Sequence, residues 1–298
     1  MKQLRDRVAV VTGAGSGIGA AMARRFGAAG MKLVVSDVDL QAAQATADAL
    51  AASGVEASAA RTDVADAAQV EALADAAYAR HGAVHLLCNN AGVVPSGRHR
   101  PVWEIPLEDW QWSHGVNAMG VVHGIRAFVP RMLAGGDEGH VVTTASVAGL
   151  ISSAGSVAYS AAKHEAVRVT EALYAGLLER QAPIGVTLLC PGLVNTRIYE
   201  SERNRPAGLL PQGGAAAEAP ELAAAASDLY RTAVSPDDVA EQLLQAVLDD
   251  RFYLLTSDAF DDAVRARCEA VLARRNPHFE SVFSLVRRDQ RERQESPR

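Results

Sequence analysis

The chain has 298 residues, of which 49% are hydrophobic and only 5% aromatic, and its formal net charge is −6. Acidic and basic residues are interspersed, so no basic surface for nucleic acid is expected. No apolar run reaches the ~20 residues that cross a bilayer, and no signal-peptide core begins the chain, so we expect a cytoplasmic protein with no membrane partner. The three cysteines are an odd number, and Cys88 and Cys190 lie in apolar runs. We therefore expect buried free thiols, which are typical of a reducing compartment.

Apolar strands alternate with helical segments along most of the chain. The expected strands are residues 8–11, 33–35, 55–60, 84–88, 141–144 and 184–190, and the expected helices are 18–29, 40–52, 67–81, 107–132 and 159–180. This alternation is typical of βαβ units, and strands that read as continuous apolar runs indicate a sheet buried on both faces. The sequence therefore predicts an α/β fold, a Rossmann-type doubly wound and mostly parallel sheet flanked by helices, in a single domain over residues 1–275.

The regular alternation stops at Pro191. Residues 192–234 contain prolines, glycines and alanine clusters without a regular apolar period. We expect this insertion to form a mobile lid over the substrate, because a long segment beside a cofactor site is usually functional. The apolar side chains expected to meet the substrate are Ile198, Tyr199, Leu209, Leu210 and Leu222 from this segment, with Val94, Trp103 and Leu150.

The remaining chain is expected to complete the sheet and to add a helical extension. Ser235 and Pro236 are typical of a helix N-cap and first helical residue. A last strand is expected at 252–255 and a last helix at 260–274. Residues 276–298 are rich in arginine and are expected to form a polar, frayed tail.

A glycine-rich loop lies between the first strand and the first helix. Glycines allow the backbone to approach a pyrophosphate closely, and the start of the helix supplies unpaired N–H groups to the anion. The residues of this loop expected to bind a dinucleotide are Gly13, Gly15, Ser16, Gly17, Ile18 and Gly19.

Asp37, at the end of the second strand, predicts which dinucleotide is bound. A carboxylate at this position accepts hydrogen bonds from the adenosine ribose and repels a 2′-phosphate. Ser16 and Val38 stand at the two positions where an arginine or lysine would hold that phosphate. The sequence therefore favours NAD over NADP.

Tyr159 and Lys163 lie four residues apart in a predicted helix, so both side chains project from one face. A phenol has a pKa of about 10 and is a poor base at neutral pH. A neighbouring ammonium favours the phenolate and lowers that pKa. Ser146 follows a predicted strand, where ligands gather in open α/β sheets, and Asn117 lies in the helical region before it. We interpret these four residues as a catalytic group.

This group, together with the glycine loop and the run Asn89-Asn90-Ala91-Gly92, resembles the short-chain dehydrogenase/reductase family. The resemblance implies that Tyr159 is the general acid/base and that Ser146 binds the substrate oxygen. It also implies that Lys163 lowers the pKa of Tyr159 and holds the nicotinamide ribose. Asn117 would position a water that links Lys163 to solvent.

The resemblance covers roughly residues 6–196 and implies further cofactor contacts. Adenine would meet Asp63 and Val64. The remaining contacts implied are Tyr159 and Lys163 at the ribose, Asn90, Ala91 and Gly92 along the cleft, and Pro191, Gly192, Val194 and Thr196 at the nicotinamide end. The stretch from Asn195 to Pro206 is similar to a subgroup that includes bacterial Cα-dehydrogenases of lignin-derived aryl ethers.

The sequence predicts an oxidoreductase that transfers a hydride between NAD and a bulky hydrophobic or aryl secondary alcohol or ketone, as a homodimer or homotetramer. The histidines are scattered without metal-ligand spacing, so no metal is expected. Two alternatives remain open. An NADPH-dependent ketone reductase is disfavoured by Asp37, and a non-catalytic dinucleotide-binding regulator has no need of the Tyr159 group.

Overall fold

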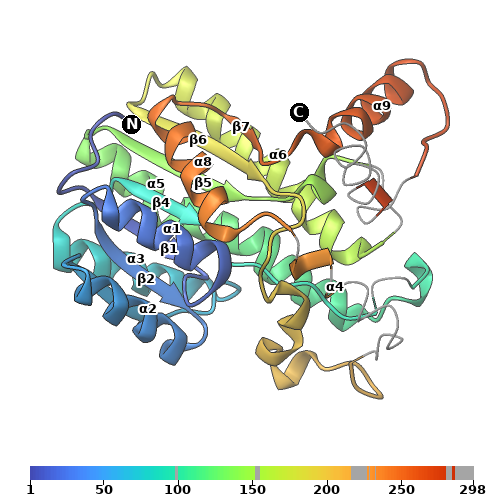
Figure 1. The fold of residues 1–298 in the computed structure, drawn as a ribbon, viewed down its shortest axis with the longest axis horizontal. Helices are drawn as coiled ribbons and strands as arrows, with labels where there is room; N and C mark the ends of the chain where they lie inside the picture. The colour runs from blue at the N-terminus through green and yellow to red at the C-terminus, as the bar shows by residue number, and fades with distance from the viewer. Residues whose placement is uncertain are drawn as a thin grey trace.

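The computed structural model describes residues 1–97, 100–151, 155–215, 227, 229–231, 233–279 and 284–285. Within this part of the chain, seven strands form one sheet in the order β3-β2-β1-β4-β5-β6-β7, and all neighbours are parallel (Figure 1). The strands are β1 (Val8–Thr12), β2 (Lys32–Asp37), β3 (Ala57–Arg61), β4 (Leu86–Asn89), β5 (Gly139–Thr144), β6 (Ile184–Cys190) and β7 (Tyr253–Leu255). The strand order reverses between β1 and β4, which is where open α/β sheets bind their ligands.

Helices cover both faces of this sheet (Figure 1). They are α1 (Gly17–Ala28), α2 (Leu40–Ala52), α3 (Ala67–His81), α4 (Leu107–His114), α5 (Gly120–Gly135), α6 (Val157–Glu179), α8 (Pro236–Leu248) and α9 (Asp261–Leu272). Short helical turns are η1 (Val102–Glu104), η2 (Gly115–Met119), η3 (Val147–Gly149), η4 (Ile198–Asn204), η5 (Ala207–Leu209) and η6 (Asp258–Phe260).

Two apolar cores sandwich the sheet, and successive strand residues point alternately into them. In β1, Ala9 and Val11 belong to the core formed with α1, α2 and α8, whereas Val8 and Val10 belong to the core formed with α3, α5 and α6. Both faces therefore require apolar side chains, which explains the continuous apolar runs in the sequence. The predicted Rossmann-type fold is confirmed.

The predicted helix over 107–132 is interrupted in the structure. The chain forms α4, then a wider π-helical turn at η2, and then α5. Such turns insert one residue into the helical repeat and often occur at functional sites. Here the turn carries Asn117 in its middle.

The helices differ in how their first turns are capped. Asp39, Asp66 and Ser235 accept backbone N–H bonds at the starts of α2, α3 and α8. Ser16, the N-cap of α1, makes no such side-chain bond. The N–H groups at the start of α1 are therefore left available to an anionic ligand.

The carboxyl-terminal region departs from the expected polar tail. Helix α9 lies at the same end of the sheet as α4 (Figure 1). Beyond it, Leu285 is buried against Val147, Ile151 and Phe260. Apolar contacts thus return the chain to the body of the protein, while residues 286–298 lie outside the described part. Among the described residues, no helix combines the length and the apolar character needed to cross a lipid bilayer.

Candidate active site

A cavity of about 650 Å³ opens at the carboxyl ends of the central strands. Every predicted catalytic and cofactor-binding residue lines it except Asn117, which lies behind the wall. The parallel sheet is the reason, because all its strands end at the same edge. Residues far apart in the sequence but directly after a strand are thereby brought together.

Close packing explains the glycines of the loop after β1. Gly13 has a φ of +62°, and a Cβ there would lie 2.7 Å from the Cα of Ala91. A Cβ on Gly19 would lie 2.2 Å from the carbonyl oxygen of Gly13. Any larger residue would push α1 away from the loop and close the space in front of its amino terminus.

Asn90 joins the ends of three strands. Its Nδ2 donates to the carbonyl of Thr12 at 3.0 Å, and Thr144 Oγ1 donates to its Oδ1 at 3.1 Å. Thr12 Oγ1 in turn accepts from the backbone N–H groups of Asn90 and Ala91. Asn90 and Thr12 therefore hold the cleft open, and this role of Thr12 had no separate signal in the sequence.

Asp37 is held by backbone amides. Its Oδ2 accepts from Gly15 N at 2.9 Å and its Oδ1 from Asp39 N at 3.1 Å. No ion pair between Asp37 and a cation occurs among the described residues, and Val38, Asp39 and Ala42 beside it also line the cavity. This end of the cavity is therefore acidic and apolar.

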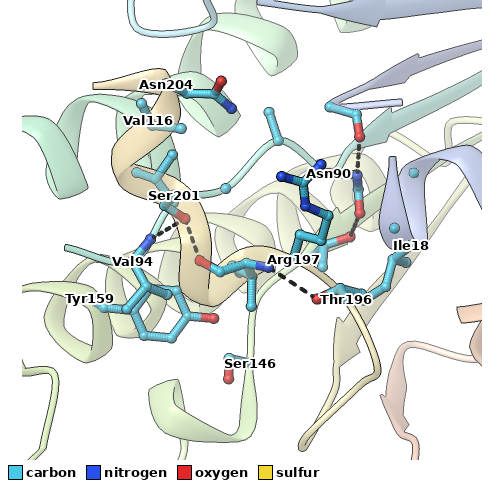
Figure 2. Close-up of a pocket in the computed structure, with 18 of the residues that line it drawn as sticks. Ile18, Asn90, Val94, Val116, Ser146, Tyr159, Thr196, Arg197, Ser201 and Asn204 are labelled. Carbon is cyan, nitrogen blue, oxygen red and sulfur yellow. Dashed lines mark hydrogen bonds between the residues drawn. The ribbon is translucent and has the colours of Figure 1, made fainter. Parts of the chain in front are cut away.

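Helix α6 presents Tyr159 and Lys163 to the cavity beside Ser146. The Tyr159 and Ser146 side chains lie next to each other on the cavity wall (Figure 2). Ser146 Oγ accepts from Ala148 N at 3.1 Å, at the start of η3. Lys163 Nζ lies 5.7 Å from the centre of the Tyr159 ring. Three of the four predicted catalytic residues thus meet at one point.

Burial determines the protonation of this group. It raises the pKa of Tyr159, and the Ser146 hydroxyl beside the phenol only partly opposes this rise. Burial also lowers the pKa of Lys163 to about 8. The net direction for Tyr159 is opposite to the one expected from Lys163 alone, because desolvation of the phenol outweighs the other contributions.

Asn117 reaches the site through the backbone beside it. Its Nδ2 donates to the carbonyl of Val93 at 2.9 Å, and its Oδ1 accepts from Val93 N at 3.1 Å. A Cβ on Gly92 would lie 3.0 Å from Asn117 Oδ1 and 3.4 Å from Lys163 Nζ. The side chain therefore fixes the loop after β4 against Lys163.

The segment after β6 crosses the cavity toward the glycine loop. A Cβ on Gly17 would lie 3.2 Å from Thr196 Cγ2. On the other side, the ring of Phe260 leaves no room for a Cβ on Gly192. The predicted nicotinamide-end residues, Pro191, Gly192, Val194 and Thr196, therefore form a wall between the loop and the catalytic group.

Beyond Tyr159 the cavity has apolar walls that the sequence identified only in part. Of the expected side chains, Val94, Ile198 and Leu209 line it. Trp103 does not, because it is 82% exposed, and Leu210 is also exposed. Leu150 does not line the cavity, because it packs against a core, and neither does Tyr199, which packs against Tyr230. Leu222 lies outside the described residues.

Trp112 and Phe279 also line the cavity, although neither is expected there from the sequence. The sequence favours a packing role for Trp112, and Phe279 lies in a region whose composition indicates a solvated tail. The expected lid role of residues 192–234 stays a prediction, and the structure describes how part of this segment is held. Residues 198–209 form η4 and η5 and are anchored through the buried Arg205, which bonds to Asp109 at 2.6 Å.

Residues 7–207 match the family model of short chain dehydrogenases. The chain belongs to the short-chain dehydrogenase family. It is 39% identical over 271 residues to 1-deoxy-11-beta-hydroxypentalenate dehydrogenase of Streptomyces exfoliatus, a match that covers 88% of this chain and 90% of that protein. It is 33% identical over 273 residues to the C alpha-dehydrogenase of Sphingobium sp. (strain NBRC 103272 / SYK-6), covering 91% and 87%.

A short-chain dehydrogenase/reductase from Burkholderia phymatum, solved in complex with NAD, is 44% identical and superposes with a TM-score of 0.87, covering 94% of this chain and 99% of that one. The predicted family and the resemblance to Cα-dehydrogenases are confirmed. This short-chain dehydrogenase is therefore an oxidoreductase that moves a hydride between NAD and an alcohol or ketone, and the non-catalytic regulator is set aside.

Proposed function

We propose that this dehydrogenase interconverts a bulky hydrophobic secondary alcohol and its ketone with NAD, using Tyr159 as the general acid/base. The observation that carries the proposal is the placement of Tyr159, Ser146 and Lys163 together on the cavity wall, with Lys163 Nζ 5.7 Å from the centre of the Tyr159 ring. A substrate oxygen at this point is oriented by the Ser146 hydroxyl and exchanges its proton with the phenol. Bound nicotinamide supplies the hydride chemistry.

The direction of the Tyr159 pKa predicts how the reaction depends on pH. Because burial raises this pKa, the phenol is protonated at neutral pH and ready to donate to a ketone oxygen. Alcohol oxidation needs the phenolate instead, so its rate is expected to rise with pH. The Lys163 ammonium, with a pKa of about 8, adds a positive charge beside the phenol below that pH.

The residues of the dinucleotide end fit NAD. The glycine loop leaves space in front of α1, and the N-cap Ser16 leaves the first N–H groups of the helix free of a side-chain cap. Asp37 and Asp39 both line the cavity beyond it, and their charges oppose a 2′-phosphate. We therefore propose NAD rather than NADP, which the NAD complex of the Burkholderia relative supports.

The apolar wall beyond Tyr159 supports a bulky hydrophobic substrate. Val94, Trp112, Ile198, Leu209 and Phe279 contribute to it. Burying apolar area stabilises a complex by about 25 cal/mol per Å², so large alcohols are favoured over small ones. The names of the pentalenate and C alpha relatives are consistent with this choice.

We further propose that the enzyme is a cytoplasmic homodimer or homotetramer. The edge strand β7 carries an exposed Tyr253, and Leu178 of α6 is also exposed, which supports assembly through this side. Cys88 and Cys190 are buried free thiols, which suits a reducing compartment. Light scattering of the purified protein and fractionation of cells test the two statements separately.

The test is turnover of a panel of secondary alcohols with NAD and with NADP. Tyr159→Phe should lower kcat about 10²–10⁴-fold, because it removes only the proton-transferring hydroxyl, and should leave NAD affinity nearly unchanged. Tyr174→Phe is the matched control, since Tyr174 lies on the same helix but packs against Phe252 outside the cavity. More than about a tenth of kcat left in Tyr159→Phe would contradict the assignment.

A further inference from the structure

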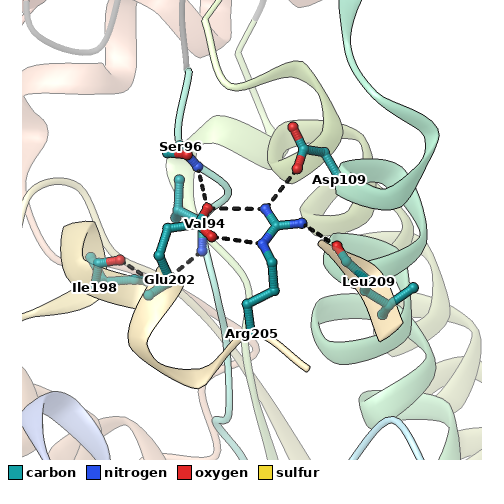
Figure 3. Close-up of polar contacts among 8 residues, drawn as sticks. Val94, Ser96, Asp109, Ile198, Glu202, Arg205 and Leu209 are labelled. Atoms are coloured by element: carbon teal, nitrogen blue, oxygen red, sulfur yellow. Dashed lines mark hydrogen bonds and ion pairs between the residues drawn. The ribbon is translucent and has the colours of Figure 1, made fainter. Parts of the chain in front are cut away.

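Arg205 is a buried cation held from several directions. Its side chain is 1% exposed, and it donates to Asp109 at 2.6 Å, to Glu202 at 2.7 Å and to the carbonyl of Leu209 at 2.9 Å (Figure 3). The guanidinium also lies 4.2 Å from the centre of the Trp112 ring. We call Arg205, Asp109 and Glu202 the arginine clamp. Each of the three guanidinium nitrogens has a partner, so one position of the side chain is strongly favoured.

The arginine clamp joins segments that are distant in the sequence. Asp109 belongs to α4, Glu202 to η4, and Leu209 to η5. Glu202 Oε1 also accepts from Ser96 N at 2.9 Å, which ties in the loop after β4. A second bond to the same loop lies beside it, because Ser201 Oγ accepts from Val94 N at 3.1 Å (Figure 2).

None of the three clamp residues lines the cavity, but their neighbours do. Trp112 follows Asp109 by one turn of α4, Ser201 precedes Glu202, and Leu209 accepts the Arg205 bond. The clamp therefore acts on the apolar wall only through the residues it holds.

The charges of the clamp also favour a single arrangement. Burial opposes ionisation of Glu202, but the bonds from Arg205 and Ser96 outweigh it and lower the Glu202 pKa. Burial raises the pKa of Asp109, which its bond from Arg205 only partly offsets. If η4 moved away from α4, at least one of these buried charges would lose its partner.

We propose that Arg205 is a positioning residue that holds the apolar wall in place and thereby sets the preference for bulky over small alcohols. This rests on the proposed function, because the preference is read from the same cavity. Arg205 touches neither the catalytic group nor the dinucleotide end, so its loss should alter substrate recognition more than proton or hydride transfer. Arginine is needed because lysine keeps the charge but cannot bond two carboxylates and a carbonyl in a fixed fork.

The experiment compares the unchanged enzyme with Arg205→Lys on 1-(2-naphthyl)ethanol and on 2-propanol, with NAD. We expect the kcat/KM ratio between the two alcohols to fall about tenfold or more, mainly through KM for the naphthyl alcohol. NAD affinity and kcat with 2-propanol should change less than about twofold. Arg24→Lys is the control, because Arg24 bonds Asp237 at the same 2.6 Å on the outer surface.

Hydrogen exchange of residues 198–209 provides a readout that does not depend on turnover. Arg205→Lys should speed exchange there and leave the strands unchanged, whereas Arg24→Lys should change neither. If Arg205→Lys does not fold, the triple variant Arg205→Met, Asp109→Asn and Glu202→Gln is used in its place, because it removes the three charges together.

The outcomes separate the two proposals. If the unchanged enzyme turns over neither alcohol nor any other on the panel, the proposed function fails. The role of the arginine clamp is then tested by measuring the binding of the naphthyl alcohol, in the presence of NAD, through the change in tryptophan fluorescence. If turnover occurs and Arg205→Lys keeps the same alcohol preference, the positioning role is overturned. Unchanged binding of the naphthyl alcohol by Arg205→Lys would overturn it as well.

Discussion

Two buried cations stand near the cavity, and their surroundings are opposite. Lys163 is 2% exposed and donates to the carbonyl of Thr144, and no ion pair with a carboxylate occurs for it in the described part of the chain. The Arg205 side chain is 1% exposed, but it lies between Asp109 and Glu202. The charge without a counter-charge has its pKa lowered to about 8, whereas the pKa of the compensated one is raised. An uncompensated buried charge can take part in chemistry, and a compensated one holds structure in place.

Removing the compensated cation should have the largest effect on stability. Arg205→Met leaves Asp109 and Glu202 buried without their partner, and such broken pairs cost about 3–5 kcal/mol. Urea unfolding of the cofactor-free enzyme measures the change. Arg24→Met should cost less than about 1 kcal/mol, because its pair with Asp237 is exposed. Equal losses in the two variants would show that the clamp does not stabilise the fold.

Removing Lys163, the uncompensated cation, should have the opposite effect on stability and raise the free energy of unfolding. The Lys163 pKa falls from 10.5 to about 8 on folding, so the unfolded chain binds more protons between these values and stability rises with pH there. Below pH 8 the cost of burying the ammonium is fully present. Lys163→Met should therefore raise the unfolding free energy at pH 7 by about 1–3 kcal/mol and flatten the rise, while turnover is lost. A destabilised Lys163→Met would contradict the comparison.

Asp37 extends the comparison to an anion, because it is held by amides and not by a cation. Its charge is therefore available to distinguish NAD from NADP. Asp37→Ala should narrow the preference for NAD over NADP by about tenfold, or about 1.4 kcal/mol, by removing repulsion of the 2′-phosphate. Asp48→Ala, on the outer part of α2, is the control. Unchanged ratios of kcat/KM for the two cofactors would refute the role of Asp37.

Phe279 allows a test of the apolar cavity wall that changes no charged residue. The side chain lines the cavity and is 58% exposed, so only part of it is available to bury against a substrate. Phe279→Ala should raise KM for the naphthyl alcohol about threefold and leave 2-propanol unaffected. Leu272→Ala is the matched control, since Leu272 is 77% exposed and does not line the cavity. Equal effects of the two variants on KM would show that Phe279 does not contact the substrate.

The sequence by itself determined the fold and the reacting end of the site. Alternating strands and helices require a doubly wound sheet, and in a parallel sheet every residue directly after a strand lies at the same edge. The glycine loop, Asp37, Ser146 and Asn90 could therefore be placed from local sequence. The helical spacing placed Tyr159 and Lys163 on one face in the same way.

Only the tertiary structure decided the substrate end and the state of the charges. Asp109 and Arg205 are 96 residues apart, and neither has a local pattern that pairs it with the other. Trp112 and Phe279 line the same cavity, and α4 and α9 lie at the same end of the sheet (Figure 1). The pKa of Tyr159 likewise depends on burial by distant segments, which raises it, whereas the lysine spacing in the sequence indicated a lowered pKa. Desolvation and long-range packing are properties of the assembled fold, so residue spacing could not predict them.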